Sequence, residues 1–415
     1  MNSRSINYVL LALLALGILS RVLAALYCQI EPVSDFKRYY DVAVEFASTG
    51  ELTRNGFPFI SQPPLYPLAL GSIFKLTGPS VLIGVYFNLA LSLLTLMLFL
   101  CFILKALDSS KFKIMALALF SLYPAVLGFL PILGVETLSL FLVVLIMLLF
   151  CYEGLFFSLF VGILISALTL TKAQYILLIA PIVIRLFILR KFGSSIMLMA
   201  GFLMVISPWI FRNYQLFDRP IAVSSNGGYT AFVNNNKDNL QSGWMPLSSI
   251  ELSDDAKKAF AKVNALDLFR EGDESEKMFL WTPAMDSIAA AEAVKWIISD
   301  PIRFIELGGL RLGAVFIYPA YTLLQWVFYT KGLLFFISLY IINLSVLLLT
   351  FGSFYFLVKN PILCVKNNLY FFSVLFIGVS AVSVFIFEGQ GRYIIPLIPV
   401  MIFLSFSNHW RNQKI

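Results

Sequence analysis

Residues 8–28, YVLLALLALGILSRVLAALYC, form an apolar segment, and residues 31–52, EPVSDFKRYYDVAVEFASTGEL, follow it as a dense group of acids, bases and tyrosines. About 20 apolar residues are enough for a helix to cross the hydrocarbon core of a membrane. Arg21 interrupts the segment and no small-x-small cleavage site follows it, so we predict a retained span and not a cleaved signal peptide. The first dense cluster of charged residues, at 31–52, therefore lies directly outside the first predicted span.

The composition extends this interpretation to the whole chain of 415 residues, which is 60% hydrophobic and 13% charged. The apolar residues recur in runs of about 20, and helices cross a bilayer because they satisfy their own backbone groups. We therefore predict an all-α polytopic protein of the inner (plasma) membrane or an endomembrane. The net charge of +7 does not indicate a nucleic-acid partner, because the basic residues lie singly or in small groups between the apolar runs.

The polar residue types limit the chemistry that the chain can perform. The single histidine, His409, lies near the C-terminal end, which excludes most Ser-His-Asp, Cys-His and His-metal sites. Four cysteines without paired spacing make a disulfide framework or a zinc site unexpected; they are Cys28, Cys101, Cys151 and Cys364. If the protein is an enzyme, its carboxylates must transfer protons.

Hydropathy predicts ten spans, near residues 8–28, 81–104, 112–131, 135–152, 155–172, 174–190, 195–212, 332–357, 368–387 and 393–408. Lysine and arginine residues gather at alternate ends of these spans, and the positive-inside rule makes those ends and both termini cytoplasmic. Residues 1–212 then form an N-terminal transmembrane module with a first outer loop at 29–80. Residues 213–331 form an outer-face loop with interfacial helices, and residues 332–415 form the C-terminal transmembrane helices.

Residues 304–329 are apolar enough to span the membrane, which would place the C-terminus outside. The segment contains Arg311 and Pro319, so we predict a helix that lies along the outer surface or re-enters the membrane. The preceding polar stretch, residues 213–303, begins with a loop rich in Asn, Gly and Ser and continues with helical periodicity. We expect a small, mainly helical cap over the outer membrane face.

The charged group outside the first span has the pattern of a helix, with Ser34 as a candidate N-cap and Gly50 as a candidate stop. Helical spacing places Asp35, Arg38, Tyr39 and Val42 on one face and Asp41 on another. One interpretation is a solvated amphipathic loop in which Asp35 only complements the helix dipole. The other interpretation is a site at the membrane edge.

Three further groups of ionisable residues fall on the same predicted face. Glu136 opens a span after Pro131 and Gly134, Lys172 stands at the junction of two spans, and the sequence FEGQGRYIIPLIP opens the last span. Burying an ionisable group at the edge of a membrane span costs free energy, so such residues by default indicate a functional site. Taken singly, each of them could instead be a snorkelling anchor.

These motifs resemble the membrane glycosyltransferases of the GT-C class, which include the dolichyl-phosphate-mannose protein mannosyltransferases and the aminoarabinose lipid A transferases. The matching stretches are SDFKRYYDVAVEFASTGELTRNGFPFISQPPLYPLALGSIFKLTG (34–78), GVETLSLFLV (134–143), LTLTKAQ (168–174), SPWIFRNYQLFDRPIAVSSNGGYTAFVNNN (207–236) and EGQGRYIIPLIPV (388–400). Each motif alone is weakly specific, but five of them in the same order cover most of the chain.

The resemblance implies a GT-C fold and the transfer of a sugar from a polyprenyl-phosphate donor to a lipid, glycan or protein acceptor of the cell envelope. Transfer would occur at the extracytoplasmic face, with inversion at the anomeric carbon. The family's catalytic acidic residues match Asp35 and Glu136, both in the N-terminal module, and its donor-phosphate residues match Lys172, Arg392 and Tyr393. Further candidates for substrate binding are Arg38, Tyr39, Tyr66, Arg212, Asn213 and Glu388.

Two departures from the family pattern bear on the site. Some relatives have a lysine shortly before the sequence PPLYP, where this chain has Gln62. The Asp-x-Asp pair of the oligosaccharyltransferases is absent, which leaves a divalent metal undecided, and no other cofactor is indicated. For Arg212 and Asn213, an interface anchor in the aromatic belt is an alternative role.

The residue types agree with this chemistry. Cations would hold the donor phosphate as it leaves, a task for Lys172 and Arg392, and a base placed opposite the leaving group, Asp35, would accept the proton of the acceptor. A transporter or lipid flippase is the main alternative, although its charges would be expected near the bilayer midplane and its halves would repeat. A non-catalytic scaffold is a further alternative. The sugar, the acceptor and the prenyl chain length remain open.

Overall fold

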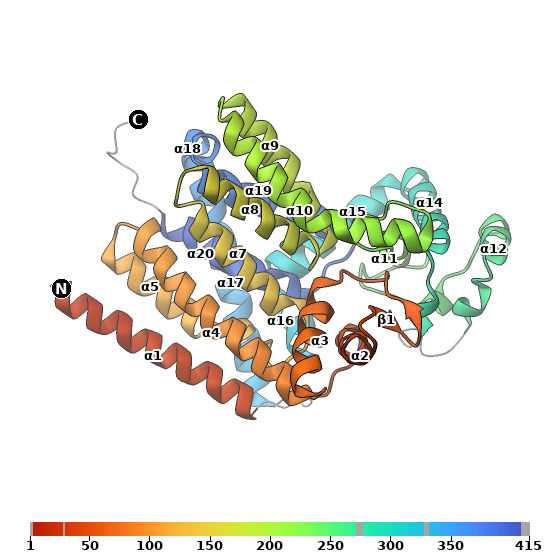
Figure 1. Cartoon of the computed structure of the whole chain (residues 1–415), viewed down its shortest axis with the longest axis horizontal. Coiled ribbons are helices and arrows are strands. Elements are labelled where there is room, and N and C mark those ends of the chain that lie inside the picture. The colour runs from red at the N-terminus through yellow and green to blue at the C-terminus, as the bar shows by residue number, and fades with distance from the viewer. Residues whose placement is uncertain (1–2, 28–29, 271–276, 328–331, 408–415) are drawn as a thin grey trace.

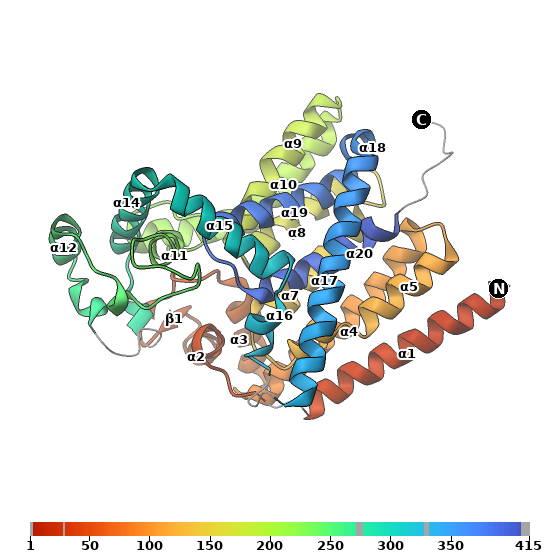
Figure 2. The same ribbon diagram turned by 180° about the vertical axis from the view of Figure 1, so that it is seen from behind.

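The computed structural model describes residues 3–27, 30–270, 277–327 and 332–407, and helices make up most of it (Figure 1). The first part of the membrane body consists of α1 (Ser3–Tyr27), α4 (Val81–Ala106), α5 (Ser110–Ser121), α6 (Pro124–Gly128), α7 (Val135–Leu149), α8 (Leu155–Thr169), η1 (Ala173–Leu178), α9 (Ile179–Ile188) and α10 (Phe192–Phe217). The last part consists of α17 (Leu333–Lys359), α18 (Pro361–Lys366), α19 (Asn368–Ile386), η5 (Gly391–Leu397) and α20 (Ile398–Phe406). Figure 2 shows α17 running over the side of the body that faces away in Figure 1.

The helices confirm the predicted polytopic membrane architecture. Six helices in the described ranges are long and apolar enough to cross a membrane: Arg4–Tyr27, Val81–Ala106, Ser110–Gly128, Phe192–Phe217, Leu333–Lys359 and Asn368–Ile386. Shorter apolar helices cover Leu65–Thr77, Val135–Leu149, Leu155–Thr169, Ala173–Ile188 and Gly391–Phe406. Each of the ten predicted spans overlaps one of these helices, so the hydropathy pattern located the apolar helices correctly.

Arg21 is fully buried within the first span and joins three helices. Its guanidinium donates to Ser92 Oγ of α4 at 3.0 Å and to the Ser121 carbonyl of α5 at 2.8 Å. Ser121 ends α5, so its carbonyl has no partner within the helix. The charge that interrupts the apolar pattern therefore supplies donors to a helix end in an apolar region, where an unpaired carbonyl would be costly.

The predicted first outer loop folds into helix α2 (Ser34–Thr49), a hairpin of β1 (Thr53–Arg54) and β2 (Phe57–Pro58), and helix α3 (Leu65–Thr77). Gly50 ends α2 in the left-handed conformation, as predicted, with φ 78°. The prediction for Ser34 was wrong. Ser34 is the first residue of the helix, the extended Val33 occupies the N-cap position, and no side chain caps this end.

The hairpin is fixed against α2 by polar contacts. Asn55 and Gly56 at its turn have φ values of 53° and 76°, as a tight antiparallel turn requires. The Glu45 carboxylate of α2 accepts from Thr53 Oγ1 at 2.8 Å and from the Asn55 amide at 2.5 Å. These contacts fix the position of the hairpin relative to α2, and with it the start of the loop that leads from the hairpin to α3.

A cap of short helices lies at one end of the molecule (Figure 1). It consists of α11 (Gly227–Asn234), η2 (Leu247–Ser249), α12 (Asp254–Ala261), η3 (Leu266–Phe269), η4 (Met278–Leu280) and α14 (Pro283–Ser299). Its buried side chains, among them Phe232, Phe260 and Trp281, form a hydrophobic cluster separate from that of the membrane body. Helix α1 begins, and α20 ends, on the side of the body away from this cap (Figures 1 and 2).

The predicted segment 304–329 is described up to residue 327, and residues 304–327 do not form one continuous helix. Helix α15 (Pro301–Phe316) ends at Ile317, and α16 (Ala320–Leu324) begins after Pro319. Neither helix is long and apolar enough to count among the described membrane-crossing candidates. The break agrees with the expectation of an interfacial or re-entrant segment, which stays a prediction.

Arg311 of α15 ties the cap to the membrane body and is fully buried. Its guanidinium donates to Asn235 Oδ1 at 3.0 Å and to the carbonyl of Asn234, both at the end of α11. It also donates to the carbonyls of Phe385 and Ile386 at 2.9 and 3.2 Å, at the end of α19. One side chain thus fixes the position of the segment that follows α19.

We expect Arg311→Met to destabilise the protein by about 2–4 kcal/mol, because it leaves several buried acceptors without their donor. Thermal unfolding of the purified protein in detergent measures this effect. The matched control is Arg219→Met, since the exposed Arg219 also links body and cap but makes one 3.4 Å contact with Ser287. A shift of equal size in both variants would contradict the role of Arg311.

The membrane topology can be tested with single cysteines in a cysteine-free background. We expect an impermeant maleimide to label Lys257→Cys, on the exposed surface of α12, from outside intact cells. The exposed Lys366→Cys should be labelled only after permeabilisation. Labelling of both positions from outside would mean that residues 304–329 cross the membrane.

Candidate active site

The four groups of ionisable residues that the sequence analysis identified lie together in one polar cluster. Helix α2 contributes Asp35 and Arg38 from its first turns, and α7 contributes Glu136 from its first turn. Lys172 stands in the turn between α8 and η1, and η5 begins beside Arg392. The cluster therefore forms where helix ends meet, and those ends are far apart in sequence.

Asp35 is the centre of the cluster because its two carboxylate oxygens have different partners. Oδ1 accepts from the guanidinium of Arg38 and from Gln62 Nε2 at 3.0 Å. Oδ2 accepts from Arg392 Nη2 at 2.6 Å. Burial raises the pKa of Asp35, but the charges of Arg38 and Arg392 outweigh that effect and lower the pKa to about 2. Asp35 is therefore ionised at neutral pH.

Glu136 is almost completely buried, with a side chain 2% exposed, and faces two cations. Its Oε1 lies 3.6 Å from Lys172 Nζ and 3.7 Å from Arg392 Nε. The Lys172 ammonium also lies 4.3 Å from the centre of the Tyr393 ring, a cation–π contact. Glu136 Oε2, Lys172 Nζ and Arg392 Nε are buried without a hydrogen-bond partner in the described ranges. Buried polar atoms without a partner are rare and need an explanation, and a ligand that pairs with them would be one.

The segment before the last helices holds Arg392 in place. Tyr393 donates its hydroxyl to Glu388 Oε2 at 2.7 Å, and Gln390 Nε2 donates to Glu388 Oε1 at 2.6 Å. The Gly391 amide donates to Thr322 Oγ1 of α16 at 2.9 Å. A Cβ atom at Gly391 would lie 1.9 Å from the Pro319 carbonyl oxygen, so only glycine permits this close approach.

Two of the predicted substrate-binding residues pack behind the cluster. The rings of Tyr39 and Tyr66 are both buried and meet edge to face, with centroids 5.8 Å apart. The Tyr66 hydroxyl donates to Asn88 Oδ1 at 3.1 Å. Asn88 in turn donates to the carbonyls of Leu130 and Ile132. This arrangement supports the backbone just before α7, which carries Glu136.

Arg212 and Asn213 lie at the end of α10 and are not in the polar cluster. Arg212 donates to the Leu52 and Phe59 carbonyls at 2.9 and 3.3 Å and packs over the Trp209 ring at 4.5 Å. The buried Asn213 donates to the Ile221 carbonyl at 2.9 Å. Both residues therefore hold loops, and Arg212 in addition borders a cavity.

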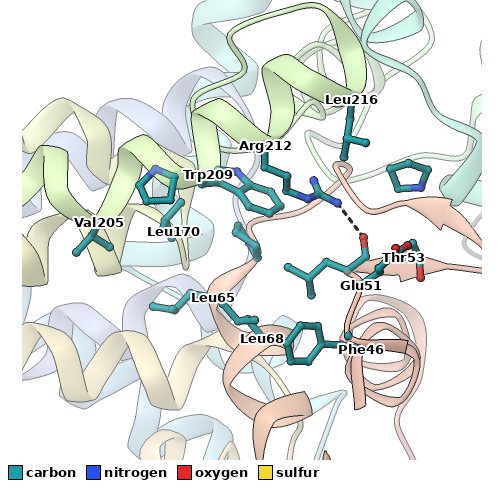
Figure 3. Close-up of a pocket in the computed structure, with 15 residues that line it drawn as sticks. Phe46, Glu51, Thr53, Leu65, Leu68, Leu170, Val205, Trp209, Arg212 and Leu216 are labelled. Carbon is teal, nitrogen blue, oxygen red and sulfur yellow. Dashed lines mark hydrogen bonds between the residues drawn. The ribbon is translucent and has the colours of Figure 1, made fainter. Parts of the chain in front are cut away.

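This cavity has a volume of about 530 Å³ and lies between α10, the hairpin and the start of α3 (Figure 3). Its lining residues are Phe46, Gly50, Glu51, Leu52, Thr53, Pro58, Pro64, Leu65, Leu68, Leu170, Val205, Pro208, Trp209, Arg212 and Leu216. Most of them are apolar, as in many binding sites for small molecules. The Leu65 amide donates to the Leu170 carbonyl at 3.0 Å, so the cavity wall adjoins both Gln62 and Lys172 in the chain.

Three further residues of the cluster were not predicted from the sequence. Phe36 lies under the Arg392 guanidinium at 5.1 Å from its ring centre, and Gln62 and Gln390 donate to carboxylates of the cluster. Phe36 follows Asp35 directly, and Gln62 precedes the sequence PPLYP. Their positions next to these motifs are the only sequence features that could have indicated that they belong to the cluster.

The donor set of the cluster does not fit a divalent metal ion. No group of three His, Cys, Asp or Glu side chains that could hold a metal occurs in the described part of the chain. Asp35 and Glu136 already face Arg38, Lys172 and Arg392. A dication beside these three cations would meet electrostatic repulsion.

Comparisons with known proteins identify the fold. No protein-family model and no curated sequence matches the chain. The oligosaccharyltransferase of Archaeoglobus fulgidus, solved with a tethered acceptor peptide containing the NVT sequon, superposes with a TM-score of 0.53 at 12% identity; the match covers 96% of this chain and 49% of that one. The same organism's oligosaccharyltransferase AglB, in complex with an inhibitory peptide and a dolichol-phosphate, gives 0.50 at 15% identity, over 96% and 50%.

The structure of ArnT from Cupriavidus metallidurans bound to undecaprenyl phosphate also aligns, with a TM-score of 0.42 at 13% identity over 98% of this chain and 78% of that one. The chain spans about half the length of the two oligosaccharyltransferase structures. The similarity to those two structures shows that the chain has a GT-C-like fold.

The pKa of Asp35 predicts a pH-dependent contribution to stability. Because the folded-state pKa lies below the ordinary value of 3.8, the contribution is fully present above about pH 4 and is lost as the pH falls towards 2. We expect the difference in melting temperature between wild type and Asp35→Asn to be constant from neutral pH to about pH 5 and to shrink below about pH 4. A difference that stays constant from neutral pH down to about pH 2 would show that the pKa is not lowered.

Proposed function

We propose that the protein is an integral-membrane glycosyltransferase that moves a sugar from a polyprenyl-phosphate donor to an acceptor at the extracytoplasmic face. The acceptor is a lipid, a glycan or a protein of the cell envelope, and the anomeric carbon is inverted. The observation that carries the proposal is the ion pair of Asp35 with Arg392, next to a second buried cation, Lys172, that shares Glu136 with Arg392. Arg392 Nε and Lys172 Nζ have no hydrogen-bond partner among the described residues. The GT-C-like fold supports it, since one structure with this fold was solved with a dolichol-phosphate.

The donor phosphate would bind between Lys172 and Arg392. Both side chains are largely buried, at 11% and 7% exposure, so water screens their charges poorly. Negative charge grows on the phosphate as the bond to the sugar breaks, and preorganised cations stabilise that charge. The Glu136 carboxylate lies within 4 Å of both cations and would keep them in place before the donor arrives.

Donor binding would also release Asp35 for catalysis. Both Asp35 oxygens accept hydrogen bonds, Oδ1 from Arg38 and Oδ2 from Arg392. A bound phosphate can replace Asp35 as the partner of Arg392. As the guanidinium turns towards the phosphate, Oδ2 becomes free to accept a hydrogen bond from the acceptor. The strong ion pair would thus hold the base inactive until the donor is bound.

In the transfer step, the acceptor oxygen or nitrogen forms a bond to the anomeric carbon on the face opposite the phosphate. The bond between that carbon and the phosphate oxygen breaks, the phosphate leaves with the electron pair, and Asp35 accepts the acceptor proton. A carboxylate with a low pKa is a weak base, so Asp35 would act mainly by orienting the acceptor and would take the proton late.

The apolar cavity supports a lipid-borne donor. It lies beside the chain segments that carry Gln62 and Lys172, and its walls are mostly aliphatic and aromatic (Figure 3). Part of an isoprenoid chain could be buried there while the phosphate reaches the cations. The apolar surface that it covers would contribute to binding at roughly 25 cal/mol per Å².

The phosphate site predicts a specific loss of function. Lys172→Ala and Arg392→Ala should each reduce transfer at least tenfold, which corresponds to about 1.4 kcal/mol, because each removes a cation from a poorly hydrated site. The measurement is mass spectrometry of the envelope glycans and glycolipids that depend on the protein. Normal product levels in both variants, at normal amounts of protein, would remove the two residues from the site.

The base predicts a difference between two aspartates of the same helix. Asp35→Asn should reduce transfer about a hundredfold or more, because it removes the proton acceptor while its shape is kept. Asp41→Asn is the matched control, since Asp41 pairs with Lys37 and Arg54 at 3.3 Å outside the cluster. Equal activity of the two variants would contradict the role of Asp35, and cells whose envelope composition is the same with and without the protein would contradict the proposed function.

A further inference from the structure

Gln62 is held in one orientation by the residue that it contacts. It is 6% exposed, lies just before Pro63 and Pro64, and donates its Nε2 to Asp35 Oδ1 at 3.0 Å. An ionised carboxylate can only accept hydrogen bonds, so the amide nitrogen must face Asp35 and the amide oxygen must point elsewhere. That oxygen, Oε1, is buried and has no hydrogen-bond partner among the residues that the structure describes.

A buried carbonyl oxygen without a donor is unfavourable in the empty protein and favourable for a ligand that brings a donor. The missing partner must carry an O–H or N–H group. A phosphate oxygen does not meet this requirement, because an ionised phosphate accepts and would repel the amide oxygen. Gln62 thus differs from the lysine found near this position in some of the enzymes that the sequence resembles.

Gln390, two residues before Arg392 in the chain, has the same arrangement. Its Nε2 donates to Glu388 Oε1 at 2.6 Å, and its Oε1 is buried and unpaired within the described ranges. In both places a carboxylate fixes the amide nitrogen and leaves the amide oxygen to a ligand. Gln62 is connected to Arg392 through Asp35, and Gln390 lies two residues before Arg392.

We propose that Gln62 and Gln390 bind hydroxyl groups of the sugar that the donor carries, and that Gln62 thereby determines specificity for a sugar-bearing polyprenyl phosphate over the bare lipid. The proposal rests on the proposed function, which places the phosphate against Arg392. The sugar is bonded to that phosphate, so the bound donor brings its hydroxyl groups close to Arg392. The alternative is that a hydroxyl of the acceptor binds to the Gln62 amide oxygen. The test below distinguishes the two, because it measures lipid binding without an acceptor.

The test measures binding of two kinds of lipid to the full-length protein in nanodiscs. The probes are undecaprenyl phosphate and undecaprenyl phosphate carrying glucose, mannose or galactose. The proteins are wild type, Gln62→Met, Gln62→Lys and Gln390→Met. Gln174→Met is the matched control, because the half-buried Gln174 lies close to Lys172 in the chain but its Oε1 already accepts from Ser383 at 2.9 Å.

We expect wild type to bind at least one sugar-bearing lipid about tenfold more tightly than the bare lipid. Gln62→Met should abolish that preference and change the affinity for undecaprenyl phosphate less than about twofold. Gln62→Lys should bind undecaprenyl phosphate more tightly than wild type, since it adds a cation, and should not restore the preference. Gln174→Met should behave as wild type.

Three results would overturn the proposal. Gln62→Met could weaken both kinds of lipid equally, as a structural residue would, or it could weaken neither, as a residue that contacts only the acceptor would. Wild type could bind the bare lipid and show no preference for any sugar. If Gln62→Met does not fold, Gln390→Met provides the same comparison. Failure of every protein to bind undecaprenyl phosphate would instead contradict the proposed function.

Discussion

The ion pair between Asp35 and Arg392 joins residues 357 positions apart in the sequence, with 2.6 Å between Oδ2 and Nη2. It connects the helix outside the first span to the segment that opens the last helices. Arg38, Gln62 and Glu136 contact one or the other member of the pair. The geometry of the cluster therefore depends on this contact, and so does the proposal that donor binding releases the base.

The cluster contains three carboxylates, Asp35, Glu136 and Glu388, and three cations, Arg38, Lys172 and Arg392. Burying so many charges is costly, and the cost is reduced because each charge has an opposite neighbour or a hydrogen bond. The pairing is incomplete, since several buried nitrogen and oxygen atoms have no hydrogen-bond partner in the described part of the chain. A purely structural cluster would gain stability by filling these positions, whereas a site for a phosphate and a sugar needs them open.

Much of the membrane body and part of the site could be predicted from the sequence, because hydropathy and helical spacing are local properties. The face that carries Asp35 and Arg38, the different face of Asp41 and the stop at Gly50 follow from those rules, and the structure has all of them. The predicted N-cap was one residue too late: the helix begins at Ser34, and the extended Val33 occupies the N-cap position. Sequence rules do not determine which of two adjacent residues becomes the N-cap.

The remaining features depend on contacts between distant segments. Gln62 reaches Asp35 only because the hairpin returns the chain to α2, and Arg311 fixes the segment before Arg392 through carbonyls at the ends of α11 and α19. Polar residues of this kind have no periodicity and no motif of their own. Their partners become visible only when the helix ends are placed together. The bonds of Tyr66 to Asn88 and of Arg212 to loop carbonyls are of the same kind, and the substrate-binding role of both residues stays a prediction.

In the proposed mechanism, a polyprenyl phosphate binds at the cluster and takes Arg392 away from Asp35. A cryo-electron microscopy structure of the full-length protein in nanodiscs with undecaprenyl phosphate tests this step. We expect a phosphate in contact with Lys172 Nζ and the Arg392 guanidinium, with the 2.6 Å contact to Asp35 Oδ2 broken and an apolar chain leading into the adjoining cavity. A phosphate bound elsewhere, with the contact between Asp35 and Arg392 intact, would contradict the proposed mechanism.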